Sequence, residues 1–502
     1  MHPLIKKLAS QTAIYGLSSI AGRLLNYLLV PLHTRIFNPG EYGVVTEFYA
    51  YVAFLNILFT YGMETAFFRY SNLEENKKKV YDTSLLSLLF TTLTLVAGIL
   101  IFSQPIATAI RYPDHADYII WFTLILGLDA ITAIPFARLR QENRPIRFAT
   151  FKLVNIITNV AFNVFFLLLC PYILATPSLE ALHGFISLVY YPELGVGYVF
   201  ISNLIASIVT MLALWKYVFV KKWEVDFILW KKMMGYALPL ILVGLAGMVD
   251  ETLSRILLKY RLEMSPEAAM HELGIFGACY KLSILMTLFI QAYRMAAEPF
   301  FFGESKKTNP QFTYARTMNF FSIFCCFIFL FVMLFIDAFK MIFIGPQFYE
   351  GVKVVPILLL ANFFLGVYYN LTIWYKLTNQ TGLGAVVAIY GAVVTIIFNW
   401  WLIPVFGYMG SAWVTLGCYG SMMIISYLMG QRYYPVPYDL KRFLVYVGIS
   451  IGLYFLSVQV EAFIPASFWY LHYLFGVILL GGFAGLVYLF ETGRIRVFKA
   501  IV

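Results

Sequence analysis

Residues 83–102 read TSLLSLLFTTLTLVAGILIF, a run of apolar and hydroxyl side chains that contains no charged group. An α-helix rises about 1.5 Å per residue, so roughly twenty such residues span the hydrocarbon core of a bilayer, which is about 30 Å thick. Lys77, Lys78 and Lys79 stand just before the run. Lysines at one end of a charge-free run are typical of a transmembrane helix that begins on the cytoplasmic side.

The whole chain has the composition of a membrane protein. Hydrophobic residues make up 61% of the 502 residues and charged residues 12%, and the mean hydropathy is +0.78. Soluble domains average about 45–50% apolar and about 25% charged residues. The apolar runs are long and do not alternate, which favours helices over a membrane barrel. We therefore predict an all-α polytopic membrane protein.

Apolar runs of about twenty residues or more, separated by polar residues, predict about fourteen transmembrane helices. They lie near residues 11–37, 42–68, 81–110, 114–139, 148–171, 194–219, 233–258, 272–300, 314–339, 350–375, 383–405, 409–430, 442–460 and 467–490.

The basic residues indicate the orientation of these helices. If the N-terminus is cytoplasmic, most of the 36 Lys and Arg residues fall in cytoplasmic loops, although the loop at Lys376 is only weakly basic. A positive cytoplasmic side is the general rule for such proteins. We predict a multi-pass protein of the cell inner (plasma) membrane with both termini in the cytoplasm. The net charge of +10 then needs no nucleic-acid partner.

The chain contains an internal repeat. At an offset of 231 residues Glu41 matches Glu272 and Gly43 matches Gly274, and at an offset of 236 Asn143 matches Asn379 and Asn163 matches Asn399. The two copies are about six helices apart and share one orientation, which predicts two pseudo-symmetric lobes around a central cavity. We expect an N-lobe at residues 1–220, a C-lobe at 221–432 and two additional C-terminal helices at 433–502.

Ionisable side chains inside the predicted helices are the candidate site residues, because each costs about 2.5–3.5 kcal/mol at the bilayer centre unless it faces protein or water. A planar guanidinium binds phosphate oxygens in pairs, so buried arginines suit a diphosphate. Ion pairs between helices are the structural alternative. The predicted substrate-binding residues of the central cavity are Arg23, Asn26, Arg255, Lys281, Gln291 and Arg294.

Carboxylates in the same helices offer two roles, and the sequence does not choose between them. They could balance the buried cations, as the spacing of Glu251 and Arg255 would allow, or take up H⁺ or Na⁺ for coupling. The sequence leaves open whether H⁺, Na⁺ or the membrane potential supplies the energy for transport. The candidates are Glu64, Asp129, Asp250, Glu251 and Glu298.

Signals for other chemistry are missing from the sequence. There is no G-x-x-x-x-G-K-[ST] phosphate loop, and the six histidines lack metal-ligand spacing. We expect no metal, no cofactor and no enzymatic activity. A saccharide polymerase or ligase would need reactive groups on an outer loop, for which residues 171–193, with Glu180, His183 and Glu193, are the only candidate.

Three motifs give the chain a family resemblance. GRLLNYLLVPLHTRIFNPGEYG from Gly22 resembles the opening of the polysaccharide biosynthesis (Wzx-type) flippases, in the MOP superfamily that also holds MATE exporters and MurJ-type lipid II flippases. GYALPLILVGLAGMVDETLSRILL from Gly235 resembles the start of that family's second lobe. The segment FNWWLIPVFGYMGSAWVTL resembles its N-x-x-x-I-P-x-x-G-x-x-G turn, at Asn399, Pro404, Gly407 and Gly410.

The resemblance implies a flippase that moves an undecaprenyl-diphosphate-linked oligosaccharide, such as an O-antigen unit for lipopolysaccharide, to the outer leaflet by alternating access. It also implies that Arg23 receives the anionic head group. Twelve helices are usual for Wzx-type members, so fourteen leave a MurJ-type lipid II flippase as an alternative. A MATE-like exporter of cationic drugs would require an acidic cavity. We expect a monomer in the lipid bilayer, with polysaccharide polymerase machinery as a possible partner.

Overall fold

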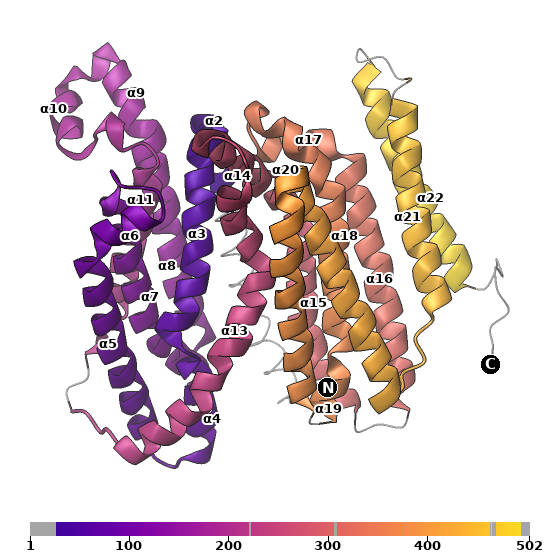
Figure 1. Ribbon diagram of the computed structural model, residues 1–502, viewed down its shortest axis with the longest axis horizontal. Helices are drawn as coiled ribbons and strands as arrows, with labels where there is room; N and C mark the ends of the chain where they lie inside the picture. Colours follow the sequence, from indigo (N-terminus) through magenta and orange to yellow (C-terminus); the bar gives the residue numbers. More distant parts are fainter. Residues whose placement is uncertain are drawn as a thin grey trace. The chain divides into compact units, whose positions relative to one another are not determined.

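The computed structural model describes residues 27–219, 222–305, 309–378, 380–461, 463 and 468–492. This part of the chain is helical and contains no strand, which confirms the predicted all-α class. Its residues divide into two compact units, the first within the bounds Met1–Tyr260 and Met264–Gly274 and the second within Arg261–Glu263 and Ile275–Val502 (Figure 1). The predicted lobe boundary at 220/221 comes from the repeat, which this division does not test, and it stays a prediction.

The first unit contains most of the first repeat together with α13. Its helices are α2 (Leu29–Ile36), α3 (Pro39–Thr60), α4 (Met63–Leu73), α5 (Lys77–Ile101), α6 (Ser103–Ala109), α7 (Ala116–Gln141), α8 (Pro145–Val164), the π-helical turn η1 (Phe165–Leu169), α9 (Cys170–Ala175), η2 (Pro177–Leu179), α10 (Glu180–Val189), η3 (Pro192–Leu194), α11 (Gly197–Ala213), α12 (Trp215–Val218), α13 (Phe227–Arg261) and the start of α14 (Pro266–Tyr280).

Helix α7 lies at the centre of the first unit, where it packs against α3, α4, α5 and α11. An aromatic cluster forms part of this packing: the ring centroids of Phe48 and Phe122 are 5.1 Å apart, and those of Phe122 and Phe200 are 4.5 Å apart. Offset and tilted rings at such distances attract each other beyond their burial. The cluster joins α3, α7 and α11.

Two repeat-matched glycines allow α3 and α14 to approach closely. A Cβ atom on Gly43 would lie 2.3 Å from the carbonyl oxygen of Met270, and a Cβ atom on Gly274 would lie 1.7 Å from that of Pro39. No larger residue fits at either position without moving the backbone. Small residues commonly serve this purpose where membrane helices cross.

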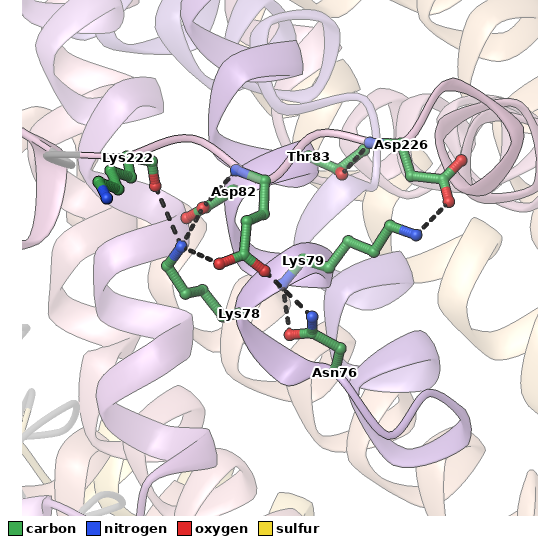
Figure 2. Close-up of polar contacts among 8 residues, drawn as sticks. Asn76, Lys78, Lys79, Asp82, Thr83, Lys222 and Asp226 are labelled. Atoms are coloured by element: carbon green, nitrogen blue, oxygen red, sulfur yellow. Dashed lines mark hydrogen bonds and ion pairs between the residues drawn. The ribbon is translucent and has the colours of Figure 1, made fainter.

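Charged groups hold the linker between α12 and α13 against the start of α5 (Figure 2). Lys79 Nζ lies 2.6 Å from Asp226 Oδ2, and Lys78 Nζ lies 2.5 Å from Glu224 Oε1. The backbone N–H of Glu224 donates to Asp82 Oδ2 at 3.0 Å. Asp226 also accepts hydrogen bonds from two backbone N–H groups at the start of α13 and thereby caps that helix. We call residues 222–226 the linker clamp.

The second unit is a separate helical bundle. It contains the end of α14, η4 (Lys281–Ser283), α15 (Ile284–Glu304), α16 (Pro310–Leu334), α17 (Ile336–Phe343), η5 (Pro346–Val354), α18 (Val355–Leu371), α19 (Ile373–Leu377), α20 (Thr381–Tyr433), α21 (Leu440–Glu461) and α22 (Trp469–Glu491). Helices α21 and α22 lie side by side and pack on α16 (Figure 1).

Helix α20 is a hairpin of two antiparallel arms. Its 53 residues would extend about 80 Å if straight, far more than a bilayer core. Gly407 breaks the helix with φ 57° and ψ −141°, a conformation that glycine adopts without a Cβ clash. Ser411 Oγ then donates to Asn399 Oδ1 at 2.9 Å across the turn. The predicted turn motif therefore forms a sharp reversal.

Among the described residues, eleven helices are long and apolar enough to cross a membrane. Three differences separate this number from the predicted fourteen. The first predicted helix lies largely outside the described residues, α11 has 17 residues and is short for a span, and α20 counts once although it contains two predicted helices. The total of fourteen stays a prediction.

Candidate functional site

A polar cavity of about 590 Å³ lies within the first unit. Helices α3, α4, α7, α8 and α11 each contribute to its lining. The lining includes four ionisable side chains that could carry charge, together with amides and hydroxyls. Pockets of about 300–1,000 Å³ are typical of small-molecule sites, so the size suits a ligand.

Glu64 and Arg140 form an ion pair in this cavity. The carboxylate is on α4, and the guanidinium is near the end of α7. The guanidinium carbon also lies 5.0 Å from the ring centroid of Phe68, a cation–π distance. Glu64, predicted to couple an ion or balance charge, thus has a cationic partner.

Asp129 and Lys152 bring a second carboxylate and a second cation to the cavity. Asp129 is exposed along the wall, where its Oδ1 accepts a hydrogen bond of 2.9 Å from Ser207 Oγ. Lys152 Nζ lies 4.2 Å from the ring centroid of Phe136. The charges of Asp129 and Lys152 interact, but no carboxylate of the described residues lies within ion-pair distance of Lys152.

Amide and hydroxyl groups complete the lining between these charges. Asn155 Nδ2 donates to Thr210 Oγ1 at 2.9 Å, and Asn203 Nδ2 donates to Tyr49 Oη at 3.1 Å. Asn56 reaches the same cavity from α3. The cavity thus offers donors, acceptors and paired charges inside an otherwise apolar bundle, as expected of a site that receives a polar group.

A different ion pair in the first unit leaves no place for a ligand. Lys259 Nζ lies 3.0 Å from both carboxylate oxygens of Glu47 and donates to the carbonyl of Ile110 at 2.7 Å. Tyr51 and Tyr112 donate to the two carboxylate oxygens at 2.7 and 2.6 Å. Both charged side chains are buried. The cluster joins α3, α13 and the segment before α7, and its role is structural.

In the second unit, the predicted residue Arg294 lines a small pocket together with Lys376. The guanidinium carbon lies 4.5 Å from the ring centroid of Tyr369, and Tyr293 Oη donates to Asn370 Oδ1 at 2.6 Å. The free volume of about 20 Å³ holds about one water molecule. The pocket is therefore too small for a ligand much larger than water.

The other predicted site residues are distributed over both units. On α13, Asp250 is buried, Arg255 is half-buried and Glu251 is exposed. Lys281 in η4 and Gln291 on α15 belong to the second unit.

Two substrate-binding predictions, Arg23 and Asn26, fall outside the described residues, and so does the side chain of Glu298. The central cavity that would bring the predicted residues together stays a prediction.

Lys152 and Arg140 are the site residues that sequence reasoning missed. The positive-inside rule accounts for both as members of the basic cytoplasmic loop between the fourth and fifth predicted helices. Lys152, however, lies inside the predicted helix at 148–171, and a lysine within a span is itself an indication of a polar environment.

The fold is shared with solved membrane transport proteins. A lipid II flippase MurJ in an inward closed conformation gives a TM-score of 0.63 at 15% identity, covering 94% of this chain and 98% of that chain. An inward-facing multidrug resistance MATE family transporter of the MOP superfamily gives a TM-score of 0.62 at 14% identity, covering 84% and 94%. The protein is thus a multi-pass membrane protein of this transporter fold class.

The sequence places the chain in a particular family. It matches the polysaccharide biosynthesis protein family over residues 8–303, more than half of its length, and it belongs to that family. No curated protein matches the sequence. The predicted family and fold class are confirmed. The solved relatives named above are a flippase and a transporter, not enzymes, in agreement with the prediction of a non-enzymatic protein.

Proposed function

We propose that the protein is a flippase that moves an undecaprenyl-diphosphate-linked oligosaccharide from the cytoplasmic to the outer leaflet of the inner membrane by alternating access. Family membership and the transporter fold support the general class. The observation that carries the proposal is the polar cavity of the first unit. A head group that is costly in hydrocarbon needs such an environment to cross the bilayer.

The position of the charged residues agrees with loading from the cytoplasm. Arg140 stands near the end of α7 that the distribution of basic residues predicts to be cytoplasmic, and it is paired there with Glu64 from the start of α4. In this proposal lipid-linked saccharides are assembled on the cytoplasmic side of the membrane, and the cavity would therefore open toward that side.

Two other transport functions are alternatives to this proposal. The similarity to a lipid II flippase makes lipid II, another polyprenyl-linked saccharide, the first alternative. A MATE-like exporter of organic cations is the second, but the described lining of the cavity contains Arg140 and Lys152 beside Glu64 and Asp129 and so has no surplus of negative charge. Cationic drugs gain little from such a cavity.

We further propose that an H⁺ or Na⁺ gradient, or the membrane potential, drives the transport. Within the cavity Glu64 is held by Arg140, so Asp129 is the candidate carboxylate for a coupling ion. Vesicles with an imposed pH gradient, an imposed Na⁺ gradient or an imposed potential distinguish these sources by which one accelerates transport. A polymerase partner and a monomeric state are part of the same proposal.

The test is a flipping assay with purified protein in vesicles. Fluorescent undecaprenyl-diphosphate disaccharide is supplied on one side, and its arrival on the other side is measured by quenching. We expect transport by the wild type and its loss in Arg23→Ala at matched reconstitution. A wild-type protein that leaves this lipid in place but extrudes small organic cations would replace the flippase by an exporter.

A further inference from the structure

Among the described residues, the charges that line the cavity of the first unit cancel. Glu64 and Asp129 supply two carboxylates, and Arg140 and Lys152 supply two cations. Arg140 is already paired with Glu64, and the field of Lys152 is opposed by Asp129. A diphosphate carries several negative charges and is best bound by a surplus of guanidinium or ammonium groups. The described residues that line this cavity do not supply that surplus.

A hydrocarbon chain fits the cavity no better. Its wall carries charged groups and the amides of Asn56 and Asn155, whose remaining hydrogen-bonding positions a polyprenyl tail would leave unfilled. A ligand with many hydroxyl groups would satisfy both kinds of wall group, because each hydroxyl donates one hydrogen bond and accepts others.

We infer that this cavity binds the saccharide part of the transported lipid and that it is built for an uncharged, hydroxyl-rich saccharide. The inference rests on the proposed flippase function and adds which part of the substrate the first unit receives. Asp129 accepts hydrogen bonds from sugar hydroxyls, while Lys152 and Asn155 donate to them. The diphosphate and the polyprenyl chain are bound elsewhere.

The contacts that fix these groups in the cavity wall support the assignment. Asp129 is fixed by Ser207 on α11, Asn155 by Thr210 on the same helix, and Lys152 by the ring of Phe136. Each polar group is therefore held in place before a ligand arrives, which lowers the entropic cost of binding. A volume of about 590 Å³ also exceeds what a single ion needs.

The test compares two lipids on the protein in nanodiscs. One is undecaprenyl diphosphate that carries an uncharged disaccharide, and the other is undecaprenyl diphosphate without sugar. We expect the wild type to bind the first about tenfold or more tightly, and Lys152→Met and Asn155→Leu each to weaken only that lipid by about tenfold, the effect of losing a hydrogen bond to a charged or buried group. Lys231→Met, an exposed lysine on α13, is the matched control.

Different failures have different meanings in this design. Equal binding of both lipids by a wild type that still transports them overturns the saccharide site but leaves the flippase. Equal weakening of both lipids by Lys152→Met also overturns it, because the cavity would then serve the diphosphate. A wild type that binds and transports neither lipid overturns the proposed function itself. Asn155→Leu keeps the test decisive if Lys152→Met does not fold.

Discussion

Glu47 and Lys259 illustrate what a pair of charges needs in order to remain inside this bundle. Bringing two charges out of water costs several kcal/mol each, and their attraction compensates only when the remaining hydrogen-bonding positions are also filled. Here two tyrosines and a backbone carbonyl fill them. The ion pair is stable because these hydrogen bonds accompany it. Removing one of the two charged residues leaves the other charge buried without its counter-charge.

We expect Lys259→Met to destabilise the protein by about 3–5 kcal/mol, because it leaves the Glu47 carboxylate buried and unpaired. The double variant Glu47→Gln with Lys259→Met should recover a large part of this loss. Thermal unfolding in detergent measures both, with Lys231→Met as the exposed control. An unchanged melting temperature for Lys259→Met would show that the pair contributes nothing to stability.

At the residue scale, the sequence reveals charges inside helices but not their partners. Glu64 and Asp129 were predicted as functional carboxylates, and both line the cavity. Their cationic neighbours Arg140 and Lys152 were not predicted, because the positive-inside rule already explained every basic residue near a cytoplasmic loop. The contact between Glu47 and Lys259 spans 212 residues, and no local pattern indicates a contact of that range.

At the element scale, the linker clamp gives the start of α13 a fixed position in the first unit. Hydrogen bonds from Lys78 and Lys79 lower the pKa of Glu224 and of Asp226, respectively, below their usual values. A group whose pKa is lower in the folded state stabilises that state above its unfolded pKa, and this contribution is lost as the pH falls through the folded pKa. The clamp should therefore hold at neutral pH and loosen in acid.

Hydrogen–deuterium exchange of the linker measures this loosening. After correction for the intrinsic rate, the amides of Glu224 and Asp226, which donate to Asp82 and Thr83, should be protected at pH 7 and lose protection below about pH 4. Lys79→Gln should expose the linker at pH 7 already. Protection that is the same at both pH values would mean that backbone contacts alone hold the linker.

The predicted helix ends and turns agree best with the structure where the local residues alone determine the backbone conformation. Pro404 and Gly407 predicted the turn within residues 399–412, and Gly407 indeed adopts a conformation suited to glycine. The fifth predicted helix was ended at Pro171, yet the helical segment continues through α9 to Ala175. Proline is tolerated in the first turn of a helix. The π-helical turn η1 ends at Leu169, so Pro171 falls in the first turn of α9.

For the whole molecule, the distribution of basic residues predicts which loops face the cytoplasm. All five native cysteines are buried, so they should react little with an added labelling reagent. They are Cys170, Cys279, Cys325, Cys326 and Cys418. Ser265→Cys should react with a membrane-impermeant maleimide in intact cells, whereas Glu75→Cys should react only after permeabilisation. The reverse pattern would place both termini outside. Both positions are exposed in the structure.

The composition and repeat of the chain were enough to predict the class of fold, since lipid as a solvent leaves few alternatives for 502 residues of this hydropathy. The compact units depend on side-chain contacts, which composition and repeat do not specify. Helix α13 belongs to the second repeat by sequence but packs in the first unit, where the linker clamp and Lys259 hold it. Side-chain partners rather than hydropathy determine that grouping.

The distance in sequence between Glu47 and Lys259 also orders events during synthesis. At about 5–20 residues per second, the ribosome adds the intervening residues in roughly 10–40 s, so Glu47 enters the membrane well before its counter-charge exists. Tyr51, one turn away on α3, is available at once, and Tyr112 follows within the first unit. The two phenols can thus donate hydrogen bonds to the Glu47 carboxylate until the Lys259 ammonium group is synthesised. The ion pair can form only once α13 has packed against the helices made before it.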